Sequence, residues 1–317
     1  MSGMDFEDED NVMDNTETRC GFVTIIGAPN AGTSTLLNAL MGTKVSIVSP
    51  KVQTTRMRVR GILMRDRSQI ILVDTPGIFQ PRRRLDRAMV AAAWEGEQEA
   101  DITALIVDAS RADVQKQAAQ ILERLNQKTE GAPRKTVLIL NKVDQAGREV
   151  LLPLSKALND AYPFAATFMI SALKDNGVED LAAWLAKEVP PGIYMYPEDQ
   201  LSDLPERLLA AEITREKLFH QMHEEIPYAL TVETESWEDF DNGDVKITQI
   251  IIIAREAHKP MIIGKGGQKI KEIGRRSRLE LERLLGRKVH LNLLVRVREN
   301  WLDDPERFGV WGLDHNA

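Results

Sequence analysis

Residues 27–35 read Gly-Ala-Pro-Asn-Ala-Gly-Thr-Ser-Thr and join an apolar run, Phe22–Gly27, to an amphipathic stretch, Ser34–Met41. They follow the pattern G-x-x-x-x-G-K-[ST], in which backbone N–H groups surround a phosphate and the lysine reaches the β- and γ-phosphates. Thr33 stands at the lysine position. The sequence therefore predicts a strand, a phosphate loop without its usual lysine, and a helix. The predicted loop residues are Gly27, Ala28, Pro29, Asn30, Ala31, Gly32, Thr33, Ser34 and Thr35.

The chain after this loop alternates short apolar runs with amphipathic stretches. The runs predict buried strands and the stretches predict helices that cover both faces of a sheet. This order is typical of an α/β fold, a doubly wound and mostly parallel sheet. The further strands expected are Gln69–Asp74, Thr103–Ser110, Thr136–Asp144 and Phe168–Ala172, and the further helices are Ala112–Leu125, Val150–Asp160 and Val178–Glu188.

The pair Pro190-Pro191 and the polar residues after it predict a linker over residues 191–204. The first domain then covers residues 20–190 and a second one residues 205–300, with residues 301–317 as a C-terminal tail. In the second domain we expect helix, strand, strand, helix, helix and strand. The bounded elements are Pro205–Glu225, Tyr228–Ser236, Lys246–Glu256, Gln268–Leu285 and Val289–Arg298.

The charge of the chain is distributed unevenly. Residues 1–18 contain seven acidic residues and no basic one, which predicts a disordered acidic tail over residues 1–19. Residues 255–298 contain 13 Lys or Arg against four Glu, which predicts a positive face there. A single cysteine, Cys20, and the lack of a signal peptide or long apolar run favour the cytoplasm.

Polar residues follow several of the predicted strands, where open α/β sheets bind ligands. Asp74, in Asp74-Thr75-Pro76-Gly77, is expected to hold Mg²⁺ through water, and the Gly77 N–H to approach a γ-phosphate. Ser34 is expected to ligate Mg²⁺ directly. Thr55, in Gln53-Thr54-Thr55-Arg56, is a further expected Mg²⁺ ligand whose carbonyl oxygen orients an attacking water.

The run Asn141-Lys142-Val143-Asp144 predicts recognition of guanine. The Asp144 carboxylate can accept hydrogen bonds from the two adjacent N–H donors of guanine, which adenine does not present. The stem of Lys142 can cover the plane of the base. After the next strand, Ser171-Ala172-Leu173 offers the Ala172 N–H to the guanine oxygen.

These motifs, together with Ile263-Gly264-Lys265-Gly266-Gly267, make residues 20–300 resemble the Era-like GTPases. The resemblance implies a GTPase domain with GTP or GDP and Mg²⁺ as its ligands, followed by a type II KH domain. A KH domain clamps single-stranded nucleic acid beside a G-x-x-G loop. The expected RNA contacts are Ile263, Gly264, Lys265, Gly266, Gly267, Lys269 and Lys271.

The resemblance also implies partners. Era-like proteins bind the 3′ end of 16S rRNA and assist maturation of the 30S ribosomal subunit. They associate peripherally with the inner face of the cytoplasmic membrane, and we expect a monomer. The Ile250–Ile253 run is too short to span a membrane and is interpreted as a strand.

Thr33 leaves two functions open. The first is a GTP-hydrolysing switch whose nucleotide state controls the grip of the KH domain on RNA. The second is a scaffold that binds RNA and has impaired hydrolysis, because losing one preorganised electrostatic donor costs on the order of 10²–10³ in rate. The sequence leaves open whether Lys44, Lys51 or Arg56 replaces the missing ammonium group.

Overall fold

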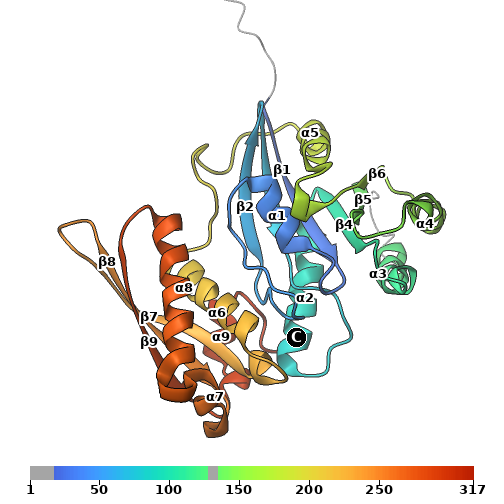
Figure 1. Ribbon diagram of the computed structural model, residues 1–317. Helices are drawn as coiled ribbons and strands as arrows, with labels where there is room; N and C mark the ends of the chain where they lie inside the picture. The colour runs from blue at the N-terminus through green and yellow to red at the C-terminus, as the bar shows by residue number, and fades with distance from the viewer. Residues whose placement is uncertain (1–17, 128–134) are drawn as a thin grey trace, which may run out of the picture.

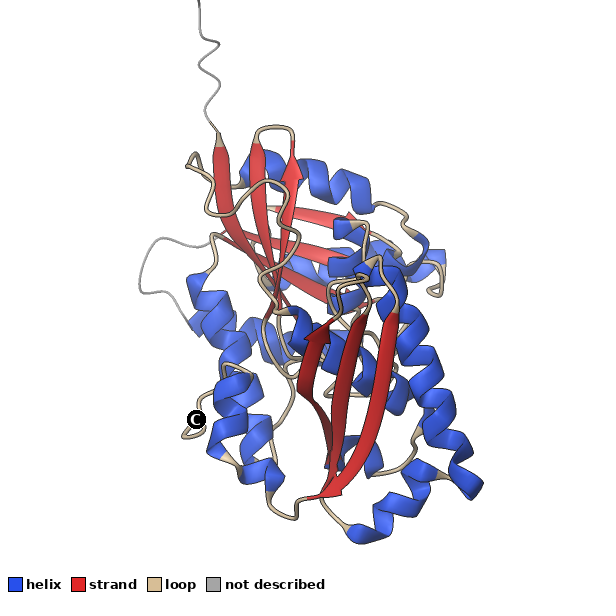
Figure 2. Cartoon of the chain, turned by 90° about the vertical axis from the view of Figure 1, so that its left-hand side faces the viewer, coloured by secondary structure: helices blue, strands red, loops and turns tan. Residues whose placement is uncertain are grey.

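A computed structural model describes residues 18–127 and 135–317 of the chain. Two β-sheets, one of six strands and one of three, form the centres of an N-terminal unit and a C-terminal unit (Figures 1 and 2). The expected acidic tail lies outside the described residues, except for its last two positions. Arg19, placed in that tail by the sequence, instead begins the first strand. No helix within the described ranges is long and apolar enough to cross a membrane.

The six-stranded sheet has the order β2-β3-β1-β4-β5-β6, and all neighbouring pairs except β2·β3 are parallel. The interior strands β3 and β4 are buried along their whole length because helices cover both faces. The edge strand β2 was not predicted, because its polar Arg60 and Arg65 interrupt the apolar pattern. The strands are β1 Arg19–Gly27, β2 Val59–Arg65, β3 Ser68–Asp74, β4 Ile102–Asp108, β5 Lys135–Asn141 and β6 Ala166–Met169.

Five helices belong to this sheet, and three of the four expected ones differ from the sequence interpretation by a few residues at their ends. The first begins directly after Gly32, whose φ of 108° is a left-handed conformation that favours glycine. The helix after β3, which begins at Arg84, was not predicted. The helices are α1 Thr33–Met41, α2 Arg84–Glu99, α3 Val114–Gln127, α4 Arg148–Ala161 and α5 Val178–Glu188.

The C-terminal unit has the expected order of helix, strand, strand, helix, helix and strand. Strand β7 pairs antiparallel with β8, and β8 pairs parallel with β9. Helices α6 and α8 pack on one face of this sheet and bury an apolar core that includes Phe219 and Ile251. The elements are α6 Glu206–Gln221, β7 Leu230–Asp239, β8 Val245–Ile253, α7 Lys259–Ile263, α8 Gln268–Leu285 and β9 Val289–Val297.

Residues 301–317 are not a tail. Trp301 lies in a short 3-10 helix, Trp301–Asp303, and Phe308 lies in α9, Pro305–Val310. Both side chains are buried, and they belong to the same core cluster as Leu85 and Met89 of α2. The C-terminus therefore ends beside α2 (Figure 1). The reason is that this segment carries two tryptophans and a phenylalanine, whose burial outweighs the ordering of the chain.

Candidate functional site

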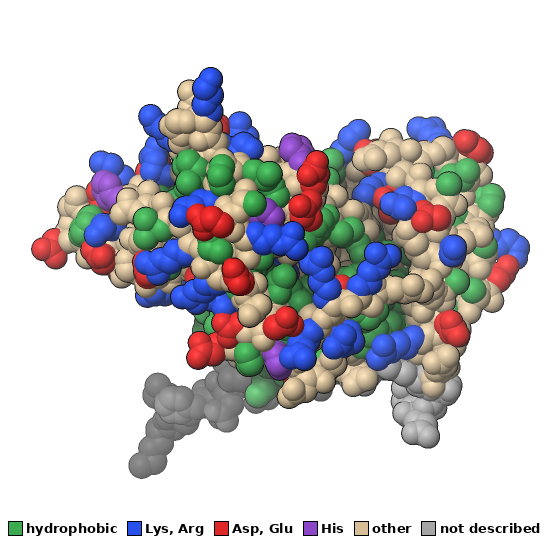
Figure 3. Space-filling model, turned by 90° about the horizontal axis from the view of Figure 1, so that it is seen from below, with side chains coloured by type: hydrophobic (Ala, Val, Ile, Leu, Met, Phe, Trp, Pro, Cys, Tyr) green, Lys and Arg blue, Asp and Glu red, His purple; other side chains and the backbone are tan. Residues whose placement is uncertain are grey.

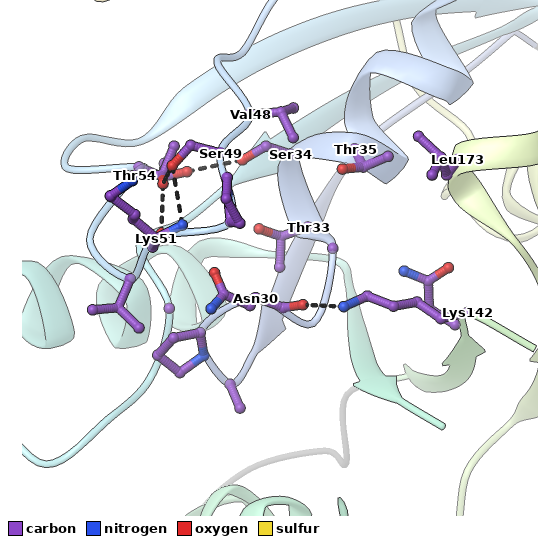
Figure 4. A pocket seen from close by; sticks show the side chains of 18 of the residues that line it. Asn30, Thr33, Ser34, Thr35, Val48, Ser49, Lys51, Thr54, Lys142 and Leu173 are labelled. Carbon is purple, nitrogen blue, oxygen red and sulfur yellow. Dashed lines mark hydrogen bonds between the residues drawn. The ribbon is translucent and has the colours of Figure 1, made fainter. Parts of the chain in front are cut away.

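A cavity of about 310 Å³ lies at the carboxyl ends of the parallel strands, where the loops after β1, β5 and β6 meet (Figure 4). This is the edge at which the sequence places the phosphate and base sites. The cavity also receives residues 47–55 from the loop between α1 and β2. Its wall includes Ala28, Pro29, Asn30, Gly32, Thr33, Ser34, Thr35, Thr55, Gly77, Asn141, Lys142, Asp144, Ser171 and Leu173.

The loop after β1 is packed so closely that two of its residues have room only for glycine. A Cβ atom on Gly27 would lie 2.6 Å from the carbonyl oxygen of Ile106, and one on Gly32 would lie 2.3 Å from Nδ2 of Asn141. The backbone therefore approaches the cavity directly, and Thr33 begins α1. Backbone N–H groups at a helix N-terminus form a cradle that fits a phosphate.

Three oxygen-bearing side chains meet beside this cradle, as the sequence predicts. The Ser34 hydroxyl donates to Oδ2 of Asp74 over 2.5 Å and lies 2.8 Å from Oγ1 of Thr55. Ser46, which sequence reasoning missed, also donates to Oδ2 over 2.8 Å. Oδ1 of Asp74 is buried and has no hydrogen-bond partner among the described residues.

This oxygen cluster fits a hard divalent cation. Burial raises the pKa of Asp74 above its ordinary value, more than the neighbouring hydroxyl groups lower it. A bound cation would supply the missing partner of Oδ1 and favour the ionised carboxylate. Hydroxyl and carboxylate oxygens are the donors that Mg²⁺ prefers, so the residues present fit this ion.

Gly77 lines the cavity beside the phosphate loop. A Cβ atom there would lie 3.0 Å from the backbone of Pro29. The next residue, Ile78, donates its N–H to the carbonyl oxygen of Gly27 over 2.8 Å. The loop after β3 is thereby held against the loop after β1, with no side chain between Gly77 and the cavity.

The far end of the cavity is organised by Asn141. Its Nδ2 donates to the carbonyl oxygen of Ala31 over 2.8 Å, and its Oδ1 accepts from the N–H of Ala172 over 3.0 Å. One side chain thus joins the loops after β1, β5 and β6. Sequence reasoning assigned Asn141 to the base site, but the structure shows that it aligns three loops.

Lys142 and Asp144 flank the same end. The Lys142 ammonium donates to the carbonyl oxygen of Asn30 over 2.8 Å and to Asp108 over 2.6 Å. Asp108 was not predicted, because it ends β4 without a recognisable motif. The Ser171 hydroxyl and the Lys174 ammonium hold the pKa of Asp144 below its ordinary value, so this carboxyl group is ionised near neutral pH. Leu173 is largely exposed at the mouth.

A second group of predicted residues forms the turn between α7 and α8 in the C-terminal unit. Gly264 has φ 75° and ψ 173°, a conformation restricted to glycine, and a Cβ atom there would lie 2.7 Å from Cβ of Lys269. Gly266 and Gly267 also have positive φ, 59° and 75°. Ile263 ends α7, and the side chains of Lys265 and Lys271 are exposed.

The positive face expected late in the chain is only partly free. Glu272 pairs with both Arg275 and Arg276, and Glu282 pairs with Arg278. Lys265, Lys269 and Lys271 have no ion pair among the described residues. Figure 3 shows the underside of the molecule, where Lys and Arg side chains gather between hydrophobic patches. Basic groups beside a glycine turn can contact a phosphate backbone.

The loop that carries Thr55 also touches the C-terminal unit. Arg215 of α6 donates to the carbonyl oxygen of Thr54, and Arg56 donates to the carbonyl oxygens of Pro227 and Leu230 over 3.2 and 2.9 Å. Glu216 of α6 accepts from the N–H of Val48 over 2.8 Å. Sequence reasoning missed these α6 residues, because nothing in a helical pattern indicates which distant loop it contacts.

Comparison with known proteins agrees with both groups of residues. Residues 22–142 match the family model described as 50S ribosome-binding GTPase, and residues 225–302 match the KH domain model. GTPase Era of Dinoroseobacter shibae is 55% identical over 298 residues, which cover 94% of this chain and 96% of that protein. The chain belongs to the Era family of GTPases.

Two solved Era structures resemble the whole fold. That of a point variant of Aquifex aeolicus Era bound to GDP·AlF4⁻ is 40% identical with a TM-score of 0.84, and the match covers 93% of this chain and 99% of that one. A second, of Era with MgGDPNP and nucleotides 1506–1542 of 16S ribosomal RNA, has the same identity and coverage and a TM-score of 0.85.

Membership confirms the fold and the enzyme class that the sequence predicts. The N-terminal unit is a P-loop GTPase domain with a mostly parallel sheet, and a KH domain follows it. The chain is therefore a GTPase, and the two solved Era structures hold GDP·AlF4⁻ and MgGDPNP.

Proposed function

We propose that this GTPase uses GTP binding and hydrolysis to control the contact of its KH domain with the 3′ end of 16S rRNA, and so assists maturation of the 30S subunit. The observation that carries the proposal is the loop of residues 47–55, which lines the nucleotide cavity and contacts α6 of the C-terminal unit. An Era structure that holds both MgGDPNP and 16S rRNA nucleotides supports the RNA partner.

In this proposal the phosphates lie on the cradle formed by residues 27–35. Ser34, Thr55 and Asp74 would hold Mg²⁺, and the Gly77 N–H would contact the γ-phosphate. Mg²⁺, when bound there, neutralises charge that develops on the transferred phosphoryl group. Thr55 orients the attacking water through its carbonyl oxygen.

The base lies at the other end of the cavity. Asp144 accepts the two adjacent donors of guanine, and Lys142 covers the base plane. Asn141 holds the loops in register through its contacts with Ala31 and Ala172. Ser171 and Leu173 complete the wall, while the Ala172 N–H, which the sequence assigns to the guanine oxygen, already donates to Asn141 in the structure.

The RNA lies against the turn between α7 and α8. Gly264, Gly266 and Gly267 let the RNA backbone approach the protein backbone, as in other G-x-x-G loops. Ile263 orients the turn, and Lys265, Lys269 and Lys271 contact phosphates. We further propose that the protein acts as a cytoplasmic monomer and associates peripherally with the inner face of the membrane through its basic side chains.

Thr33 favours a second candidate function, an RNA-binding assembly scaffold that binds GTP but hydrolyses it poorly. Its neutral hydroxyl cannot replace the charge of the lysine that the loop pattern specifies. Single-turnover GTP hydrolysis, measured for the parent and for Thr33→Lys with and without a 16S rRNA 3′ fragment, separates the two candidates. If the parent hydrolyses GTP at a rate that the RNA fragment changes, the result supports the switch. If only Thr33→Lys hydrolyses GTP, the result supports the scaffold.

A further inference from the structure

The phosphate loop has no lysine, so a cation from elsewhere in the chain must neutralise a γ-phosphate. Lys44 forms salt bridges with Glu216 and Glu280, and Lys142 forms one with Asp108. Arg56 is fully buried, and it donates to two backbone carbonyl oxygens of the C-terminal unit. None of these three charges is free to move onto a phosphate without breaking a buried contact.

Lys51 differs from these cations. It lines the same cavity as Thr33, and in Figure 4 its side chain extends away from Thr33. Within residues 18–127 and 135–317, its ammonium group has one hydrogen-bond partner, the carbonyl oxygen of Phe219 at 2.5 Å, and no carboxylate partner. An ammonium on a flexible four-carbon stem exchanges such a neutral partner readily for an anion.

The carbonyl oxygen that accepts the hydrogen bond from Lys51 lies at the end of a helix. Phe219 lies in the last turn of α6, so its carbonyl oxygen has no intrahelical donor. An ammonium group at this carbonyl oxygen stabilises the end of the helix. A hydrogen bond from the same ammonium group to a desolvated phosphate is stronger, because the phosphate is charged. Lys51 is therefore held near the cavity by a contact that it can give up.

We propose that Lys51 replaces the missing loop lysine, by leaving the Phe219 carbonyl oxygen and donating to the γ-phosphate of GTP. The inference rests on the proposed nucleotide site and extends it to a residue outside the phosphate loop. It also makes the Lys51–Phe219 contact and the γ-phosphate contact mutually exclusive. Binding of GTP, but not GDP, then removes a cap from the C-terminus of α6.

The test combines two positions. Affinities for GDPNP and GDP are measured by fluorescence titration for the parent, Lys51→Met, Thr33→Lys and the double variant. Lys51→Met is expected to weaken GDPNP about 10- to 100-fold in the parent and to weaken GDP much less. In the Thr33→Lys background the same change is expected to cost less than about threefold. Lys187→Met, which removes an equal charge from α5, controls for net charge.

A second readout does not depend on turnover. Acetylation of lysines by an amine-reactive reagent, mapped by mass spectrometry, is expected to fall several-fold at Lys51 when GDPNP is added and to stay unchanged with GDP. Equal GDPNP affinity in the parent and Lys51→Met overturns the inference, as does an equal loss in both backgrounds. If Thr33→Lys also binds neither nucleotide, the proposed nucleotide site fails, and the inference fails with it.

Discussion

Arg215 of α6 donates a hydrogen bond to the carbonyl oxygen of Thr54, the residue that precedes Thr55 in the wall of the nucleotide cavity. On the other side of Thr55, Arg56 is anchored to the carbonyl oxygens of Pro227 and Leu230 and lies 5.6 Å from the ring of Trp301. The C-terminal unit thus holds Thr55 from both sides. Movement of Thr55 toward or away from a metal ion therefore strains contacts of the C-terminal unit.

Removing the Arg215 guanidinium is expected to free this segment. Arg215→Met keeps the length of the buried stem but leaves the Thr54 carbonyl oxygen and Glu212 without their donor. We expect a loss of about 2–4 kcal/mol in the free energy of unfolding and faster hydrogen exchange over residues 47–57. Arg111→Met, which removes an exposed partner of Asp113, is expected to change stability by about 0.5 kcal/mol at most. Equal effects of the two variants would contradict this coupling.

Glu216 carries a second contact between the two units. It accepts from Lys44, from Lys217 and from the N–H of Val48, and its side chain is 4% exposed. Glu216→Gln is expected to lower the free energy of unfolding at pH 7 by about 1.5–3 kcal/mol, because it removes one of the two carboxylates that pair with the Lys44 and Lys217 ammonium groups and leaves only Glu280. Glu99→Gln, at an exposed pair with Arg58, is the matched control.

The same residue predicts how stability depends on pH. Burial alone would raise the pKa of Glu216, but the Lys44 and Lys217 ammonium groups outweigh it and hold the pKa below 4.5. The contribution of Glu216 is therefore complete above pH 4.5 and disappears as the pH falls through the lower, folded-state pKa. Thermal unfolding between pH 7 and pH 3 is expected to show the parent and Glu216→Gln converging in acid. A constant difference would show that the charge of Glu216 is not the source of its effect.

Base recognition is tested at Asp144. In Asp144→Asn one acceptor oxygen becomes an N–H donor, which then faces the amino group of guanine. We expect GDP affinity to fall by about 10²–10⁴ and preference to shift to XDP, whose base has a carbonyl oxygen in that place. Competitive titration of the two nucleotides measures both effects. The neighbouring Asp175→Asn keeps a residue that tolerates its φ of 54° and is expected to leave the preference unchanged.

The sequence predicts the elements that have local signals. Helices α5 and α8 begin and end where their patterns place them, because glycines with left-handed φ precede both helices, Pro190 follows the first and Gly286 ends the second. The oxygen cluster of Ser34, Thr55 and Asp74 also follows from motifs. Strand β2 was missed because arginines interrupt its apolar pattern, although its partner β3 follows it directly. Ser46 and Asp108 have no local signal, since each is defined by a partner about 30 residues away in the chain.

Sequence reasoning also missed the contacts between the N-terminal unit and the C-terminal unit. Arg215 and Glu216 are ordinary charged residues of a helix until the fold brings residues 47–56 against them. Trp301 was missed in the same way, because residues 301–317 were interpreted as a tail. Its burial beside Arg56 depends on both units being folded and docked. Pairings between distant segments of this kind are not encoded in local periodicity.

The RNA contact is tested at two glycines with matched geometry. Gly266 lies in the turn between α7 and α8 and Gly243 in the turn between β7 and β8; both have positive φ, and neither has an atom within 4 Å of its added Cβ. Aspartate tolerates this conformation, so Gly266→Asp and Gly243→Asp are both expected to fold. Only the first places a negative charge beside the proposed phosphate contacts of Lys265 and Lys269.

We expect Gly266→Asp to weaken binding of a 16S rRNA 3′ fragment about 10- to 100-fold and Gly243→Asp to leave it unchanged. Lys265→Met is expected to lower the slope of log affinity against log salt by about 0.7, the value for one phosphate contact on a single strand. Binding is measured by fluorescence anisotropy between about 50 and 200 mM salt, with circular dichroism as the folding check. If the two aspartate variants bind equally well, this turn does not contact the RNA, and the free basic side chains of α8 must hold it elsewhere.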